Sequence, residues 1–313
     1  MLRTVAGRGR QCRPMSTPLP IQPRATVAIV TGGGRGIGLL VARALADART
    51  SVGLVARSHD ELTRAVALIE EAGGTAASAV ADVTDGPQLA HAIAELRSTL
   101  GPIDLLVNNA GVSGPIGPLW EVDPDAWWMT MDVNLRGVVL ASHLVLPEMV
   151  ARGRGRIINL TSQAGVHRWP LVSAYSVSKA AVTKLTENLA RETSRHGVSV
   201  FSVHPGLLPI GMSETVTGHA PATPHEERIQ QWTLEQLESG HGADPQQAVD
   251  LILRLAAGDA DGLSGRHLSV HDDLDAVVAH QQEIRDEDLY VLRPDRLRFF
   301  RPDQLCRAAA LAR

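Results

Sequence analysis

The sequence predicts an α/β fold in which helices cover both faces of a doubly wound parallel sheet. From position 26 onward, short apolar runs alternate with helical segments, which is typical of parallel strands joined by crossover helices. A glycine-rich turn links the first apolar run to the first helical segment. With 313 residues, 44% of them hydrophobic, the chain suits a single α/β domain with an extension at each end.

The two ends of the sequence differ in composition from the middle. Residues 1–24 contain five arginines and several prolines but no acidic residue. They lack the apolar core of about 7 to 15 residues that a secretory signal needs. We predict a disordered extension over 1–24 with Met15 as an alternative start, one domain over 25–292, and an arginine- and proline-rich tail over 293–313.

Bulk composition argues against several classes of function. The formal net charge is −4, and no basic run is interleaved with aromatic residues, so nucleic-acid binding has no electrostatic basis. Cys12 and Cys306 form neither a disulfide framework nor a metal-ligand pattern, and the histidines within 207–245 also lack metal-ligand spacing. No uninterrupted apolar run approaches the roughly 20 residues of a membrane span. We therefore expect a cytoplasmic protein without a metal site.

The first strand and helix form a predicted anion-binding turn. Val27–Val30 is apolar and leads into Thr31-Gly32-Gly33-Gly34-Arg35-Gly36-Ile37-Gly38, after which apolar residues recur at helical spacing. Backbone N–H groups at a helix N-terminus attract a phosphate, and glycine lets it approach closely. In this position between strand and helix, the turn predicts a Rossmann-like dinucleotide-binding unit.

The end of the second strand, Ser51–Val55, indicates which dinucleotide is bound. Units that prefer NAD usually place an acidic residue there to bind the ribose 2′-hydroxyl, whereas this chain has Ala56 followed by Arg57. Arg57 and Arg35 would pair with a 2′-phosphate, so we predict NADP(H) in preference to NAD(H). The alternative is that both arginines are ordinary solvated side chains.

The remaining elements continue the alternation. We predict strands over 75–80, 103–107, 156–160, 198–203 and 265–270, and helices that start at the Ser58–Glu61 capping box, span 84–100 and 124–150, or end near His196. Parallel strands end at the ligand crevice. Two of these ends carry polar residues suited to a nucleotide, Asp82-Val83 and Asn108-Asn109-Ala110-Gly111, although Asp82 alone could serve as a turn or cap residue.

A tyrosine and a lysine lie one helical turn apart, at Tyr175 and Lys179. The chain holds only two tyrosines and two lysines, so composition alone gives this pairing a chance of about 1 per cent. Positions i and i+4 share one helix face. A nearby cation is expected to lower the phenol pKa below its reference value of about 10, which prepares the tyrosine for proton exchange near neutral pH.

Jointly, these motifs resemble the short-chain dehydrogenase/reductase family, in its compact single-domain branch. The resemblance covers roughly 26–270, and the motifs match in order and spacing. They are Thr31-Gly32-x-x-x-Gly36-Ile37-Gly38, Asp82-Val83, Asn108-Asn109-Ala110-Gly111, Asn134, Ser162 thirteen residues before Tyr175, Tyr175-x-x-x-Lys179, and Pro205-Gly206.

The resemblance implies hydride transfer between NADP(H) and a secondary alcohol or ketone. Tyr175 would act as general acid or base on the substrate oxygen, and Ser162 would donate a hydrogen bond to that oxygen. Lys179 would hold the nicotinamide ribose and lower the pKa of Tyr175, while Asn134 would position a water that links Lys179 to solvent. Asp82 would face the adenine. The implied cofactor-binding residues are Thr31, Gly32, Gly34, Arg35, Gly36, Ile37, Gly38, Arg57, Asp82, Val83, Asn108, Ala110, Gly111, Tyr175, Lys179, Pro205 and Gly206.

One position departs from the family pattern. Members commonly carry a threonine four residues after the glycine of Pro205-Gly206, where it contacts the nicotinamide carboxamide. This chain has Ile210 there. The carboxamide contact must therefore come from the backbone or from another side chain.

Three irregular stretches are expected to select the substrate: 112–120, 163–170 and 207–245, the last as a lid. Trp120, Trp169 and Trp232 lie in or beside them and suggest a partly apolar alcohol or carbonyl substrate larger than a short alcohol. Packing or a subunit contact is the equal alternative for these tryptophans. The resemblance also suggests a homodimer or homotetramer.

Two other functions are compatible with the same scaffold. One is a nucleotide-binding protein without turnover, against which the intact set of Asn134, Ser162, Tyr175 and Lys179 argues. The other is a lyase or epimerase that uses the phenol without net redox change. Product formation without any change in NADPH absorbance would indicate the latter.

Overall fold

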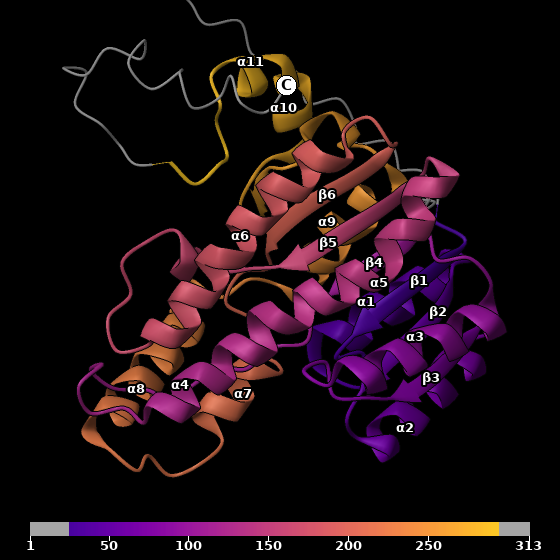
Figure 1. The fold of residues 1–313 in the computed structure, drawn as a ribbon. Helices are drawn as coiled ribbons and strands as arrows, with labels where there is room; N and C mark the ends of the chain where they lie inside the picture. Colours follow the sequence, from indigo (N-terminus) through magenta and orange to yellow (C-terminus); the bar gives the residue numbers. More distant parts are fainter. Residues whose placement is uncertain (1–24, 294–313) are drawn as a thin grey trace, which may run out of the picture.

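The computed structural model describes residues 25–293, which contain one seven-stranded sheet with helices on both faces (Figure 1). The predicted N-terminal extension, 1–24, and residues 294–313 of the predicted tail lie outside the described residues. The predicted fold class is confirmed.

All neighbouring strands run parallel, in the order β3-β2-β1-β4-β5-β6-β7. Strands β2 and β3 are therefore added on one side of β1, and strands β4 to β7 are added on its other side. A ligand crevice forms where the order reverses, between β1 and β4. The strands are β1 (Val27–Thr31), β2 (Ser51–Ala56), β3 (Ala76–Val80), β4 (Leu105–Asn108), β5 (Gly155–Leu160), β6 (Val198–His204) and β7 (His267–Ser269).

Helices alternate with the strands, and several of them begin after a serine, threonine or aspartate whose side chain caps the first turn. The Ser58 side chain accepts a hydrogen bond from the Glu61 N–H, as the capping box predicted. The helices are α1 (Gly36–Asp47), α2 (His59–Glu71), α3 (Gly86–Leu100), α4 (Pro124–Met131), α5 (Gly137–Arg152), α6 (Ser173–Thr193), α7 (Met212–Thr217), α8 (Pro224–Glu238), α9 (Pro245–Ala257), α10 (Leu274–Ala279) and α11 (Gln281–Asp286).

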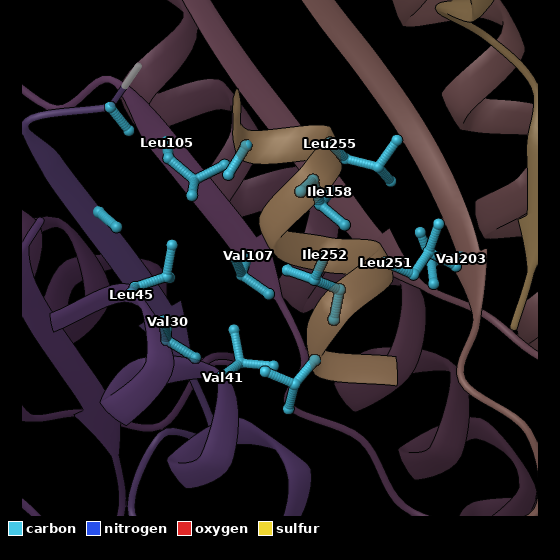
Figure 2. Close-up of a cluster of buried hydrophobic side chains, with 14 of the residues drawn as sticks. Val30, Val41, Leu45, Leu105, Val107, Ile158, Val203, Leu251, Ile252 and Leu255 are labelled. Carbon is cyan, nitrogen blue, oxygen red and sulfur yellow. The ribbon is translucent and has the colours of Figure 1, made fainter. Parts of the chain in front are cut away.

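Each face of the sheet has its own apolar core. Residues of α1, α2 and α9 pack on one face, and residues of α3 and α5 pack on the other. Figure 2 shows the first core, where Leu251, Ile252 and Leu255 of α9 lie over the sheet beside Val41 and Leu45 of α1. Strands that are buried on both faces are apolar along their length, and Val27 to Val30 of β1 form such an unbroken apolar run.

The predicted continuous helix over 124–150 is interrupted at its centre. Residues Asp132–Arg136 form a π-helical turn between α4 and α5, with Asn134 fully buried inside it. A π turn inserts one extra residue into the helix and is common at functional sites. Propensity and periodicity carry no clear mark of such an insertion.

The same rod, Pro124–Arg152, has the length and mean hydropathy of a membrane span, and it is the one such helix among residues 25–293. Its α5 half contributes Ala141, Val145 and Met149 to the core on the sheet, while α4 packs against α6. These contacts are those of a core helix in an α/β fold.

Truncating Ile252 to alanine should lower the free energy of unfolding by about 2–5 kcal/mol, because its fully buried side chain would leave a cavity between α9 and the sheet. Urea denaturation measures the change. The matched control is Leu68→Ala on α2, where the side chain is 43% exposed and the loss should stay below about 1 kcal/mol. Equal losses at both positions would contradict this account of the core.

Candidate active site

Two adjoining clefts open at the carboxyl ends of the strands. The first, of about 570 Å³, runs along the glycine-rich turn and the ends of β2 and β4. The second, of about 410 Å³, lies over the ends of β5 and β6 beneath α7 and α8. We call them the nucleotide cleft and the substrate cleft. Ile37, Asn109, Ser113, Gly211 and Met212 line both, so the clefts meet.

The glycine-rich turn lies directly against the neighbouring strand end. A Cβ atom at Gly38 would stand 2.3 Å from the Gly32 carbonyl oxygen and 2.4 Å from Asn109 Nδ2, so only glycine fits. Gly36 has φ +55°, and a Cβ there would lie 3.2 Å from Gly211 Cα. The turn is thus a backbone surface at the start of α1, the arrangement that accepts a pyrophosphate.

Asn109 holds the mouth of the nucleotide cleft in shape. Its Nδ2 donates to the carbonyl oxygens of Thr31 at 2.9 Å and Gly32 at 3.0 Å. In return, Thr31 Oγ1 accepts from the N–H groups of Asn109 and Ala110, each at 3.1 Å. Four hydrogen bonds therefore join the end of β4 to the end of β1 at the point where the strand order reverses.

Two arginines stand at the far end of the nucleotide cleft, each near a carboxylate. Arg35 Nε lies 3.8 Å from Glu61 Oε1, and Arg57 Nη1 lies 3.9 Å from Asp82 Oδ2. Both guanidinium side chains are mostly exposed. Asp82 also accepts from the Thr84 N–H and hydroxyl, so it acts as a turn residue and as part of the cleft wall.

The residues with catalytic potential gather in the substrate cleft around the start of α6. Ser162, just beyond β5, forms a side-chain hydrogen bond with Tyr175. Lys179, one turn further along α6, is 5% exposed and donates from Nζ to the Leu160 carbonyl oxygen at 2.9 Å. Its ammonium lies 5.6 Å from the centre of the Tyr175 ring.

Asn134 supports this group from the π turn. Its Oδ1 accepts from the Val112 N–H at 2.8 Å, and its Nδ2 donates to the Val112 carbonyl and to Ser178 Oγ. A Cβ at Gly111 would lie 3.2 Å from Asn134 Oδ1 and 3.6 Å from Lys179 Nζ. Gly111 therefore keeps a small space open between the Asn134 amide and the Lys179 ammonium.

The expected acidification of Tyr175 is not what the structure shows. Burial raises the pKa of Tyr175 above its usual 10.0, while the hydrogen bond from Ser162 acts in the opposite direction. Burial lowers the pKa of Lys179 from 10.5 to about 8. The desolvation of the phenol outweighs the effect of Ser162, so Tyr175 is protonated at neutral pH.

Two of the three singled-out tryptophans close the substrate cleft. Trp169 and Trp232 both line it and meet edge to face, with ring centres 4.8 Å apart. Trp232 belongs to α8, so the predicted lid contributes half of this pair. Trp120 is different: its side chain is 85% exposed, and it lies outside the lining of either cleft.

Comparison with known proteins identifies the family. A model of the short chain dehydrogenases matches residues 26–220. The chain belongs to this family. Galactitol 2-dehydrogenase of Rhizobium johnstonii is 36% identical over 245 residues, 78% of this chain and 92% of that protein. Gluconate 5-dehydrogenase of Gluconobacter oxydans is 31% identical over 243 residues, again 78% and 92%.

Solved structures of similar proteins agree with this assignment. An actinorhodin polyketide ketoreductase with NADPH has a TM-score of 0.72 at 31% identity, covering 79% of this chain and 95% of its own. A gluconate 5-dehydrogenase of Burkholderia cenocepacia, in complex with NADP and tartrate, has a TM-score of 0.71 at 30% identity, covering 82% and 98%. This short-chain dehydrogenase is an oxidoreductase with an NAD(P)-binding Rossmann-type fold, and the backbone cradle of Gly32, Gly36 and Gly38 fits that cofactor.

The structure distributes the predicted site residues of this short-chain dehydrogenase over three places. Those that line the nucleotide cleft are Gly32, Gly34, Arg35, Gly36, Ile37, Arg57, Asp82, Val83, Ala110 and Gly111. Those that line the substrate cleft are Ser162, Tyr175, Lys179, Pro205 and Gly206. Buried beneath the clefts are Thr31, Gly38, Asn108 and Asn134.

Asn108 was predicted to bind the cofactor, but Asn109 is the asparagine of this motif that lines the clefts. Asn108 is 2% exposed and donates to Asn159 Oδ1 at 2.8 Å, inside the sheet. Asn109 lines both clefts instead. Successive side chains on a strand point to opposite sides, and at the end of β4 the second asparagine rather than the first lines the clefts.

Several lining residues were missed by sequence reasoning. Ser58 and Glu61 line the nucleotide cleft, and their capping box at a helix N-terminus was the available signal. Gly211, Met212 and Thr215 reach the same cleft from α7 and its start. Nothing in their local sequence marks them, because a lid is placed by tertiary structure.

Replacing Lys179 by methionine should change the free energy of unfolding in a way that depends on pH. Compared with wild type at the same pH, the variant should be more favoured at neutral pH than at alkaline pH. The folded pKa of about 8 lies below the unfolded value of 10.5, so the unfolded chain binds more protons between these values and wild-type stability rises with pH there. The difference between wild type and variant should shift in favour of wild type by about 2–3 kcal/mol from pH 7 to pH 10. Urea denaturation across this range measures it.

The control for this titration is Lys184→Met, which removes the other lysine at a half-exposed position. Its difference from wild type should stay flat with pH. A flat difference for Lys179→Met as well would show that the Lys179 ammonium is not desolvated.

Proposed function

We propose that this chain reduces the carbonyl group of a partly apolar ketone, with NADPH as cofactor and Tyr175 as general acid. The observation that carries the proposal is the hydrogen-bonded pair of Ser162 and Tyr175 in the substrate cleft, which adjoins the nucleotide cleft, with Lys179 close by on the same helix. When bound, the nicotinamide cofactor supplies the hydride. The residues of the chain position the ketone and move the proton.

The proton transfer follows from the state of the phenol. Because burial keeps Tyr175 protonated, its O–H can donate to the carbonyl oxygen and deliver the proton as negative charge develops there. With the ketone bound, the single Ser162 O–H donates to the same oxygen instead of to Tyr175 and stabilises that charge. Ketone, hydride and this proton together give the secondary alcohol. The protonated phenol is the form that serves reduction, and the phenolate would serve as base in the reverse oxidation.

Reprotonation of Tyr175 is assigned to the groups beneath it. Lys179 lies one turn away and has a pKa of about 8, so it can exchange a proton near neutral pH. The space bordered by Gly111, between Asn134 Oδ1 and Lys179 Nζ, suits a bridging water. Asn134 is a positioning residue in this path because its own contacts are to Val112 and Ser178.

The preference for NADPH rests on charge at the end of β2. Arg57 follows the strand, and Arg35 stands in the glycine-rich turn, both at the rim of the nucleotide cleft. Ser58 opens α2 beside them, which adds a helix N-terminus to the anion site. The NADPH and NADP complexes among similar structures support the same choice.

The apolar character of the substrate rests on Trp169 and Trp232. Their edge-to-face pair forms a wall of the substrate cleft, and aromatic walls favour aromatic or aliphatic substrate bodies over small polar ones.

A homo-oligomer and a cytoplasmic location are further parts of the proposal. Light scattering of the purified protein tests the first.

Replacing Tyr175 by phenylalanine should lower kcat for NADPH-dependent ketone reduction by at least about a thousandfold, because the proton donor is lost. NADPH affinity should change by less than about threefold. Steady-state kinetics on a panel of aryl ketones and NADPH fluorescence titration measure the two effects. Retained turnover in this variant, or product formation without NADPH oxidation, would contradict the proposal.

Replacing Arg57 by alanine should weaken NADPH binding about tenfold while leaving NADH binding nearly unchanged, because only NADPH carries the 2′-phosphate. Loss of the arginine also leaves the Asp82 carboxylate, 3.9 Å away, without its cation. Fluorescence titration with each nucleotide measures the ratio. Arg64→Ala, at an exposed arginine of α2, is the control. Equal weakening for both nucleotides would contradict the assignment.

A further inference from the structure

His204 stands in the substrate cleft beside the catalytic serine. It is the last residue of β6, and Val203 pairs with Leu160 of β5. The Thr161 N–H donates to the Val203 carbonyl, so His204 lies one strand away from Thr161 and Ser162. His204, Ser162 and Tyr175 all line the substrate cleft. The motifs and the proposed proton path leave this residue without a role.

The His204 ring has no hydrogen-bond partner among residues 25–293. Its Nδ1 is fully buried and unpaired. Nε2 is therefore the ring nitrogen that remains accessible from the cleft. Buried N–H groups are rarely left unpaired, whereas an unpaired lone pair is better tolerated. The ring is thus assigned the tautomer with the proton on Nε2, which makes it a donor toward the cleft.

The surroundings of the ring keep it uncharged. Burial, together with the imidazoles of His267 and His271, lowers the pKa of His204 to about 3. His271, whose ring centre is 6.1 Å away, also lines the cleft. His267 is held by Thr161 Oγ1 and Ser202 Oγ, each 3.2 Å from Nδ1. Arginine and carboxylate side chains are absent from the described lining of this cleft, so a neutral oxygen is the natural partner for a neutral donor.

We propose that His204 is a specificity-determining residue whose Nε2–H donates to a second oxygen of the substrate. The backbones of neighbouring strands lie about 4.8 Å apart and both side chains line the same cleft, so we place the two oxygens on nearby atoms of the substrate. The inference rests on the proposed function and names its substrate class. The substrate is a ketone with a further carbonyl or hydroxyl oxygen one or two carbon atoms from the reacting group, and its apolar body contacts Trp169 and Trp232.

Matched ketone pairs test the inference directly. Benzoylacetone carries a second oxygen that benzylacetone lacks, and acetylbenzoyl carries one that phenylacetone lacks. Wild type should show a higher kcat/KM for the dioxygenated member of at least one pair. His204→Phe should lower that preference by about tenfold or more, because a site built to bind an oxygen loses its donor. Reduction of the single ketone should fall less than reduction of the dioxygenated member, because the single ketone has no oxygen for His204 to bind.

Three further measurements separate this role from a structural one. His204→Gln retains an N–H at a similar reach and should restore most of the preference. His196→Phe, at an exposed histidine beyond α6, should leave the preference as in wild type. Thermal unfolding monitors the fold of each variant. An equal loss for both members of a pair, or weaker NADPH binding in His204→Phe, would overturn the inference.

Binding of the same ketones to the NADPH complex of Tyr175→Phe, measured by calorimetry, keeps the two proposals distinct. If wild type reduces none of the ketones, the proposed function fails. In that case, the binding data still decide the role of His204. The Tyr175→Phe variant should bind the dioxygenated compounds more tightly, and the double variant with His204→Phe should lose this preference. Equal affinity for both members of each pair would refute it.

Discussion

The site depends on the hydrogen bonds that join β1 to β4 where the strand order reverses. At this point the chain leaves β1 for one face and β4 for the other, so no crossover helix covers the edge between them. Asn109 Nδ2 donates to the carbonyl oxygens of Thr31 and Gly32, and Thr31 Oγ1 accepts from the N–H groups of Asn109 and Ala110. Because backbone and side chains satisfy each other here, the edge stays ordered while remaining open to a ligand.

A second constraint is the burial of an amino group under the substrate cleft. An ammonium removed from water costs stability unless it finds partners, and Lys179 has the Leu160 carbonyl as its hydrogen-bond acceptor. Desolvation of the Lys179 ammonium lowers its pKa. The fold tolerates this penalty near the start of α6, which places the amino group where a proton path to Tyr175 can start. Stability and catalysis therefore make opposite demands on one residue.

Much of this architecture could be predicted from the sequence, for reasons that differ between elements. The inner strands β1, β2, β4, β5 and β6 follow from apolar runs that are buried on both faces, and the glycine-rich turn follows from the contact at Gly38 that excludes any Cβ. Ser162, Tyr175 and Lys179 could be assigned to one site because their spacing forms a known pattern. The protonation of Tyr175 could not be predicted, since desolvation depends on how α6 packs. The exposure of Trp120 and the cleft position of Asn109 also depend on loop paths that local sequence does not encode.

The π turn at Asp132–Arg136 adds one residue to the helical rod, so that the half before the turn packs against α6 and the half after it packs against the sheet. Each residue advances a helix by about 100°, so an insertion rotates everything downstream by that angle. Before the turn, Trp127 points toward α6 and donates to Ser173 Oγ; after it, Val145 and Met149 point into the sheet. Two apolar stripes, offset around the axis, thus replace one continuous stripe. Deleting a residue from this turn would put the stripes back in phase and turn one half of the rod away from its neighbour.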